Sequence, residues 1–384
     1  MICQKHLFSL DENITYLNCA FMSPLMKTVE EAGVAGVLRK REPYLLSGDD
    51  FFTESKELRQ EFAKLINAKD AQRIAIIPSV SYGLANVAKN LSLEPGDNII
   101  VVGEQFPSNI YPWHEVAKKH SADIITVSAP SESHNRGELW NEAILNAIDS
   151  RTKLVALANI HWADGTIFNL PEIRERSKQV NALLVIDGTQ SVGALPFDVD
   201  VVQPDALVVA GYKSLMGPYS IGLAYYGPAF DNGTPIEQNW INRYKSDDFA
   251  NLVNYSDEYQ PGALRYGVGE QSNFILVPMM LEALRVLNEL KPINIQKYCS
   301  SIIENPINEL RDAGFIIDSA KNRAANLFGI RLAKHHSMEA IKTSFTKNNI
   351  HVSYRGDAIR VSPNMYNDVA DLEKLTHILL QSYS

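Results

Sequence analysis

The stretch LLVIDGTQSVGALPFDVDVVQPDALVVAGYKSLMG, residues 183–217, decides the fold. It contains two short apolar runs, LLVI and ALVVA, and a charged residue follows each of them: Asp187 the first and Lys213 the second. Apolar runs of roughly four to eight residues bounded by turn residues are typical of strands buried on both faces of a parallel sheet. The pattern therefore predicts two such strands, with a carboxylate and an amine at their carboxyl ends.

The alternation of short β-branched runs and amphipathic segments extends outward from this stretch, starting near residue 70. Helical patterns follow the first runs, which predicts a mainly parallel sheet with helices on both faces. Only a short turn precedes the last run, IGLAYYG, which favours an antiparallel strand there. The other strand-like runs are RIAIIP (73–78), NIIVVG (98–103), DIITVSA (123–129), KLVALANI (153–160) and IGLAYYG (221–227).

The C-terminal part of the chain shows a different pattern. FILVPMMLEALRVLNEL (274–290) is typical of a connecting helix, and the runs after it show little parallel alternation. The fold class expected is α/β, with a three-layer αβα large domain over residues 22–274. A smaller α+β domain would be formed by residues 1–21 and 275–384.

Composition restricts the classes of function. The 384 residues are 45% hydrophobic and 21% charged, with a formal net charge of −9, so electrostatic binding to nucleic acid or to an anionic membrane is not expected. No long apolar run predicts a membrane span, and the first residues lack the pattern of a signal peptide. The three cysteines, Cys3, Cys19 and Cys299, have no metal-binding spacing. We expect a cytoplasmic protein without a metal site.

Polar residues at the ends of the predicted strands are the candidates for a site, because ligands bind there in open parallel sheets. Ser79 and Ser81 stand at the start of a predicted helix, where serine either caps the helix or helps to bind an anion. Asp187 is costly to bury unless it caps a turn or meets a cation. Lys213 either extends its amine to solvent or has a lowered pKa and acts as a nucleophile.

Taken together, these groups indicate one cofactor. Asp187 and Lys213 are 26 residues apart, which is one strand-to-strand step. A carboxylate for a ring nitrogen, an amine for an aldehyde and a helix start for a phosphate match the parts of pyridoxal 5′-phosphate. The combination of a carboxylate, a lysine and a helix start, without a metal-binding motif, therefore predicts a pyridoxal-phosphate site.

With these motifs the chain resembles the class V aminotransferases, a family of fold-type I pyridoxal-phosphate enzymes. The resemblance extends from YLNCAFMSP (16–24) to AIRVSPNMYND (358–368). DGTQ (187–190) and the Tyr212–Lys213 pair are its most specific motifs, and EQFPSNIYPW (104–113) is similar to the isopenicillin-N-epimerase-like members.

The resemblance implies roles for individual residues. Lys213 would form the Schiff base with the cofactor aldehyde, and Asp187 would bind the ring nitrogen. Arg360 would take the substrate α-carboxylate, for which a planar bidentate donor is suited. The remaining cofactor contacts implied are Val80, Ser81 and Tyr212 at the phosphate, Phe106 on the ring face, and Gln190, with His161 or Trp162, near the phenolic oxygen. The segment RYGVGEQSN (265–273) would come from a partner subunit, which implies a homodimer.

The departures from the desulfurase members of the family are informative. Tyr212 and Phe106 stand where those members carry histidines, as in kynureninase-like proteins. Residues 300–384 contain no cysteine, and Cys299 lies in a helical pattern, so persulfide-forming desulfurase activity is not expected.

The reaction expected is that of an aminotransferase acting on an amino acid. Lyase and epimerase reactions stay open, because all three share their first steps. A non-catalytic cofactor binder is disfavoured, since Lys213, Asp187 and Arg360 are all present. A nicotinamide-dependent dehydrogenase is disfavoured too, because no GxGxxG motif follows an early strand.

Overall fold

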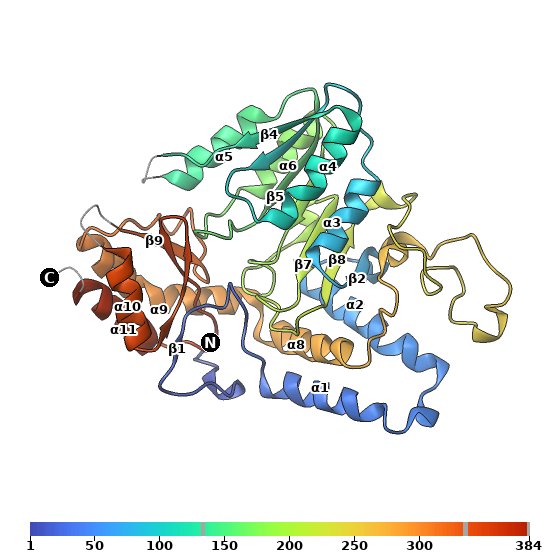
Figure 1. Ribbon diagram of the computed structural model, residues 1–384, viewed down its shortest axis with the longest axis horizontal. Helices are drawn as coiled ribbons and strands as arrows, with labels where there is room; N and C mark the ends of the chain where they lie inside the picture. Colours follow the sequence, from blue (N-terminus) through green and yellow to red (C-terminus); the bar gives the residue numbers. More distant parts are fainter. Residues whose placement is uncertain (132–134, 333–336, 382–384) are drawn as a thin grey trace.

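A seven-stranded sheet forms the centre of the molecule, in the order β2-β8-β7-β6-β5-β3-β4 (Figure 1). The computed structural model describes residues 1–131, 135–332 and 337–381. The strands of this sheet are β2 (Ile74–Ile77), β3 (Asn98–Val102), β4 (Asp123–Val127), β5 (Thr152–Ala158), β6 (Leu183–Asp187), β7 (Ala206–Ala210) and β8 (Gly222–Tyr226).

The strand directions agree with the pattern of the sequence. The pairs β7–β6, β6–β5, β5–β3 and β3–β4 are parallel. Strand β8 is antiparallel to both β2 and β7. The mainly parallel sheet and the antiparallel orientation of the run at 221–227 are therefore confirmed.

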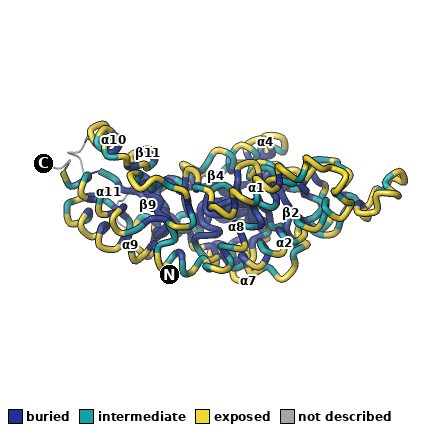
Figure 2. Tube along the Cα trace, turned by 90° about the horizontal axis from the view of Figure 1, so that it is seen from below, coloured by how far each residue is buried: buried dark blue, intermediate teal, exposed yellow. Residues whose placement is uncertain are grey.

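Helices cover both faces of the sheet, because alternate side chains of each strand point to opposite faces. In β3, Ile99 and Val101 belong to one buried cluster, with α3 (Val80–Lys89) and α4 (Tyr111–His120). Ile100 and Val102 belong to the other. The helices on that second face are α2 (Thr53–Leu65), α5 (Arg136–Ala147), α6 (Leu170–Gln179) and α8 (Leu276–Leu290). Figure 2 shows the buried chain as a continuous interior between exposed outer turns. The three-layer α/β fold is confirmed.

The C-terminal part forms a second group of elements. A three-stranded antiparallel sheet has the order β11-β12-β9, and β1 (Thr15–Tyr16) pairs in parallel with β10 (Ile350–His351). The N-terminal residues therefore join this group, beside the C-terminal elements in Figure 1. The other elements are β9 (Phe328–Arg331), β11 (Ser353–Arg355), β12 (Ala358–Val361), α9 (Pro292–Asp312), α10 (Met338–Lys347) and α11 (Val369–Gln381).

The division of the chain at residues 274 and 275 stays a prediction. Helix α8 packs on α1 (Lys27–Arg39) and α2, whereas α9 packs mainly on α11. The expected connecting helix, α8, therefore contacts mainly α1 and α2, and the helix after it, α9, contacts the second group. One short helix, α7 (Val199–Val202), lies between β6 and β7.

Within the described residues, no helix has both the length and the apolar character to cross a membrane.

Candidate active site

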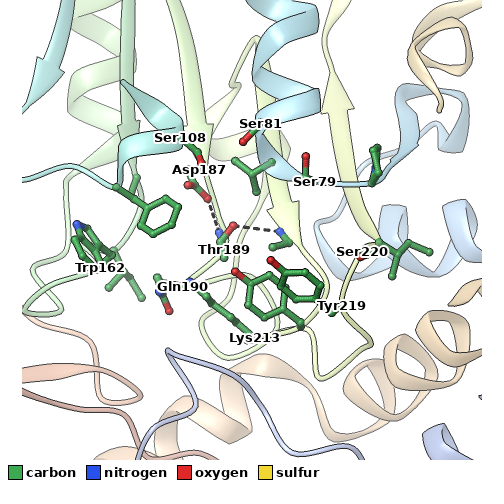
Figure 3. A pocket seen from close by; sticks show the side chains of 18 of the residues that line it. Ser79, Ser81, Ser108, Trp162, Asp187, Thr189, Gln190, Lys213, Tyr219 and Ser220 are labelled. Carbon is green, nitrogen blue, oxygen red and sulfur yellow. Dashed lines mark hydrogen bonds between the residues drawn. The ribbon is translucent and has the colours of Figure 1, made fainter. Parts of the chain in front are cut away.

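A cavity of about 300 Å³ lies at the carboxyl ends of the central strands (Figure 3). Asp187 and Ala210, the last residues of β6 and β7, line it, and so does Ala158 at the end of β5. The other lining residues are Pro78, Ser79, Val80, Ser81, Gln105, Phe106, Ser108, Ile160, Trp162, Thr189, Gln190, Tyr212, Lys213, Tyr219, Ser220 and Ile221. The structure thus brings together nine of the eleven candidate residues named individually from the sequence; His161 and Arg360 do not line the cavity.

Asp187 is held at the base of this cavity by the turn that follows β6. Its Oδ1 accepts a hydrogen bond from the backbone N–H of Thr189 at 3.0 Å, and the Thr189 hydroxyl accepts one from Ala210 N–H at 3.1 Å (Figure 3). Burial raises the pKa of Asp187, while the hydrogen bonds from Thr189 and the charge of Lys213 act in the opposite direction. A cation placed against this carboxylate would therefore stabilise its ionised form.

Lys213 lies in the turn after β7, with its side chain 7% exposed. Its Nζ is 5.3 Å from the centroid of the Phe106 ring and 5.5 Å from that of Tyr212. Burial lowers the pKa of Lys213 to about 8, although the charge of Asp187 raises it. A sizeable fraction of the amine is therefore neutral near physiological pH, as nucleophilic attack on a carbonyl requires.

The two turns that carry Asp187 and Lys213 can approach each other because of one glycine. Gly193 has a φ of +105°, which side chains rarely adopt, and a Cβ there would collide with the carbonyl of Ser214. The chain between Asp187 and Gly193 therefore packs directly under the lysine turn.

The start of α3 forms the opposite wall and is suited to an anion. Ser79 is the N-cap of the helix, and its hydroxyl accepts a hydrogen bond from Tyr82 N–H at 3.2 Å. Val80 and Ser81, in the first turn, also line the cavity. The unpaired N–H groups and the dipole of a helix start favour a phosphate.

Two buried amides in the cavity wall have polar atoms without protein partners. Gln190 donates from Nε2 to the carbonyl of Ala20 at 3.1 Å, but its Oε1 has no partner in the described structure. Nε2 of Gln105 is unpartnered as well. Buried polar atoms are normally hydrogen-bonded, so these two fit a polar ligand in the cavity. Together with a carboxylate, an amine and an anion site, they fit pyridoxal phosphate.

His161 does not reach the cavity. Its ring is fully buried, packs against Trp140 with a centroid separation of 4.9 Å, and places Nδ1 3.2 Å from Oδ1 of Asp164. Its neighbours Ile160 and Trp162 line the cavity instead. The chain turns at residues 162–164, where Gly165 N–H donates to the His161 carbonyl at 2.9 Å, and the His161 ring lies on the Asp164 side of this turn.

Arg360, on β12, lies behind the cavity wall and does not line the cavity. It is 1% exposed, and its Nη1 donates to the carbonyl of Trp162 at 2.9 Å. Its Nη2 donates to Oγ of Ser353 at 3.2 Å, whereas its Nε has no partner among the described residues. Burial lowers the pKa of Arg360 to about 9.

Several lining residues were not expected from the sequence. Ser108 follows Phe106 by two residues, and Thr189 lies inside the DGTQ motif. Both residues come after a predicted strand, and this position could have indicated that they line the cavity. Tyr219 and Ser220 come from the loop before β8, and the Tyr219 ring contacts the Tyr212 ring at a tilt, with centroids 4.6 Å apart. Nothing in their spacing indicated the cavity.

The chain belongs to the aminotransferase class-V family, whose model matches residues 45–375. An uncharacterized aminotransferase of Schizosaccharomyces pombe is 24% identical over 98% of this chain and 93% of its own length. The uncharacterized aminotransferase YcbU of Bacillus subtilis is 26% identical over 80% of this chain and 78% of its own length. A cysteine desulfurase of Salmonella typhimurium is 30% identical, over 45% of this chain and 42% of its own.

Solved structures with the same fold include a cysteine desulfurase of Thermococcus onnurineus, with a TM-score of 0.83 at 18% identity. The alignment covers 99% of this chain and 98% of the desulfurase chain. A mutant of the protein C-DES with glycine covalently linked to its pyridoxal-phosphate cofactor has a TM-score of 0.86 at 19% identity, over 99% of both chains. At these identities the likeness shows the fold.

Family membership defines the general chemistry. Class V aminotransferases use pyridoxal 5′-phosphate, and this chain is a pyridoxal-phosphate-dependent enzyme that acts on an amino acid.

Proposed function

We propose that this chain is an aminotransferase that moves the amino group of an amino acid to a 2-oxo acid. The observation that carries the proposal is the placement of Lys213 and Asp187 at neighbouring strand ends in one cavity. When bound, pyridoxal phosphate supplies an aldehyde that condenses with amines and a ring that accepts electrons from the substrate. The roles proposed below for the residues of this chain follow from their surroundings.

Lys213 is proposed to hold the cofactor covalently and, once released by the substrate, to move the Cα proton. Its lowered pKa of about 8 suits both tasks, because a base acts best when its pKa is near the working pH. The Phe106 and Tyr212 rings beside the amine exclude water from one side of it. General-base help of this kind is worth roughly 100- to 10,000-fold in rate.

Asp187 is proposed to keep a proton on the ring nitrogen of the cofactor. The hydrogen bond from Thr189 N–H to Oδ1 fixes the orientation of the carboxylate. The position of the second oxygen, Oδ2, is thereby fixed as well. Val80, Ser81 and Tyr212 are proposed to hold the phosphate, and Phe106 to cover the ring.

Gln190 is proposed to donate its second amide hydrogen to the phenolic oxygen, since the first is bound by Ala20. Arg360 is proposed to bind the substrate α-carboxylate from behind Trp162, through the Nε that lacks a protein partner. His161 would contribute through the position of Trp162, because its own ring faces Asp164.

The surroundings of the cysteines support transamination over desulfuration. A desulfurase of the persulfide type needs a reactive thiolate. Cys19 and Cys299 are buried, and burial raises the pKa of Cys19 to about 11. Neither they nor Cys3 line the cavity. The relatives from Schizosaccharomyces pombe and Bacillus subtilis, which match most of the chain, are named uncharacterized aminotransferases.

The test uses the purified protein loaded with pyridoxal phosphate. Single ¹⁵N-labelled amino acids are added with and without a 2-oxo acid, and transfer of the label to the acceptor is measured by mass spectrometry. Transfer that depends on the acceptor would support the proposal. Release of pyruvate, sulfide or another fragment without an acceptor would replace it with a lyase, and loss of optical rotation alone would replace it with an epimerase.

The residue assignments have their own control. Borohydride reduction of the loaded protein should fix the cofactor on the peptide that contains Lys213. Lys213→Ala should lose this label, and Lys69→Ala, at an exposed lysine, should keep it. A label that survives in Lys213→Ala would contradict the assignment.

A further inference from the structure

Arg355 and Arg360 project from the same face of one β-hairpin. In the antiparallel pair β11–β12, Ser353 is opposite Arg360 and Arg355 is opposite Ala358. Residues opposite each other share a face, and so do residues two apart on one strand. The two arginines are therefore diagonal neighbours on one side of the hairpin. The two positive charges act on each other, since the charge of Arg355 lowers the pKa of Arg360 in addition to the larger effect of burial.

Both guanidinium groups lie against Trp162, which lines the cavity. The Cζ of Arg355 is 5.1 Å from the Trp162 ring centroid, and that of Arg360 is 5.9 Å away. The charges of both arginines also lower the pKa of Lys213, which lies inside the cavity. The arginine face of the hairpin is thus close enough to the cavity to influence the amine.

Neither arginine has a carboxylate partner in the part of the chain that the structure describes. Arg355 is half-buried and donates from Nη1 only to the adjacent carbonyl of Tyr354, and its Nε has no partner. Nearby, Arg331 pairs with both Asp164 and Asp357, so the local carboxylates are already engaged. No carboxylate among the described residues thus compensates the two arginines, which points to an anionic ligand.

We propose that Arg355 forms a second anion subsite that binds the side-chain carboxylate of a dicarboxylic amino acid or of its 2-oxo acid. In this arrangement Arg360 takes the α-carboxylate and Arg355 the distal one, both beside Trp162 at the edge of the cavity. This inference rests on the proposed aminotransferase function, whose substrate class it specifies.

The cofactor phosphate is not the anion in question. The helix start that suits a phosphate is at Ser79 and Ser81, on the opposite side of the cavity from Trp162 in Figure 3. A single α-carboxylate would leave one of the two guanidinium groups uncompensated. A substrate with two carboxylates compensates both, and guanidinium is suited to bidentate binding of each.

The test measures binding of glutarate and butyrate to the loaded enzyme by calorimetry. Both are unreactive, and they differ in the second carboxylate. Wild type should bind glutarate at least about 10-fold more tightly than butyrate, as expected for one charge-assisted hydrogen-bonded pair. Arg355→Gln should remove most of this preference. Arg285→Gln, at an exposed arginine on α8, should preserve it.

Kinetics with reacting substrates provide the second measurement. Arg355→Gln should lower kcat/KM for glutamate or aspartate by about 10- to 100-fold, and leave the values for glutamine and asparagine within about threefold. Arg355→Lys should recover part of the loss, because it keeps the charge without the planar fork.

Three outcomes would overturn the subsite. One is equal binding of glutarate and butyrate by wild type, and another is an unchanged glutarate preference in Arg355→Gln. The third is a preference for O-phospho-L-serine over glutamate that depends on Arg355, which would assign the subsite to a phosphate.

If Arg355→Gln failed to fold or to retain cofactor, the wild-type ratio of glutarate to butyrate affinity and the Arg355→Lys variant would decide. Glutarate has no amino group, so amino transfer that failed while this binding persisted would overturn the aminotransferase proposal alone.

Discussion

Two buried groups of opposite charge set each other's protonation at the centre of the cavity. Burial favours the neutral form of both Lys213 and Asp187, so it lowers the pKa of the first and raises that of the second. Each charge then partly offsets this effect on the other. In the cofactor-free protein, Lys213 is consequently a reactive amine. Its pKa depends on Asp187, which lies at the end of the neighbouring strand.

The first prediction concerns the pH at which Lys213 becomes reactive in the cofactor-free protein. Below about pH 8 the amine is charged and unreactive, and above it the amine is neutral. Acetylation of Lys213, followed by mass spectrometry, should therefore have a midpoint near pH 8, whereas exposed lysines should titrate near about pH 10.4. Asp187→Asn should move the midpoint lower, because the Asp187 charge raises the pKa of Lys213. A midpoint near 10 in wild type, or a rise in Asp187→Asn, would contradict the prediction.

At this scale the sequence predicted much of the site. Asp187 and Lys213 follow apolar runs directly, so their place at strand ends could be derived from the pattern. His161 shows where such derivation fails, because it precedes a turn, and proximity to Trp162 in the sequence does not tell which of the two side chains faces the ligand. The contact of Arg360 with the Trp162 carbonyl joins residues 198 positions apart, for which a single sequence has no signal.

Among the elements, the turn between β5 and α6 connects the large sheet to the small one. Asp164 is its centre: it accepts from the Thr166 hydroxyl at 2.9 Å and pairs with Arg331 of β9 at 2.8 Å and with Arg136 at 3.3 Å. Gly165, with a φ of +79°, packs where a Cβ would collide with the carbonyl of Leu327. The turn thereby holds Trp162 against the arginine hairpin.

The second prediction tests the contribution of this buried network to stability. Asp164→Asn should lower the free energy of unfolding by about 3–5 kcal/mol, because it leaves Arg136 without a carboxylate and Arg331 with only the exposed Asp357. Asp357→Asn removes a carboxylate that pairs with the same Arg331 but is 77% exposed, and it should cost no more than about 1 kcal/mol. Urea denaturation measures both. Equal effects of the two substitutions would contradict the prediction.

The same network predicts a pH dependence with a definite sign. Burial would raise the pKa of Asp164, but the hydrogen bond and charge of His161 and the charge of Arg331 hold it well below its usual range. A carboxyl group whose pKa is lower in the folded state stabilises the protein above its unfolded pKa, and this contribution is lost as the pH falls. The difference in stability between wild type and Asp164→Asn should therefore shrink below about pH 4. A difference that grew on acidification would exclude this origin.

The elements show why some of the structure could not be predicted. The strands from β2 to β8 have short apolar runs with clear limits, and all of them were expected. Helices α1 and α2 precede this alternation, and α1 exposes Val34 and Val37 as well as burying Val29, so its apolar residues give no single face. The hairpin β11–β12 was expected as two strands, but its arginine face depends on register, which a shift of one residue reverses.

On the scale of the whole molecule, apolar side chains are exposed on α1 and in the segment 240–256. Val34 and Val37 on α1 are each 55% exposed. The segment 240–256 projects from the body in Figures 1 and 2, and in it Val253 is 76% and Tyr255 97% exposed. These exposed apolar residues are the ones we expect to contact a second copy of the chain. The residues 265–273, expected to act in a partner subunit, do not line the cavity of their own chain.

The third prediction is that these groups bury themselves in a homodimer that completes the site. Sedimentation equilibrium of wild type should give twice the mass of one chain. The double substitution Val34→Glu and Val37→Glu should shift the protein toward monomer, because it places charges in the interface. Val201→Glu, at an apolar residue on α7 that is 61% exposed, should leave the dimer intact.

Since residues 265–273 of a partner would approach the phosphate, the monomeric variant should also bind pyridoxal phosphate more weakly, measured by its absorbance on titration. A wild-type monomer, or a monomeric variant with unchanged cofactor affinity, would show instead that each chain forms its site alone.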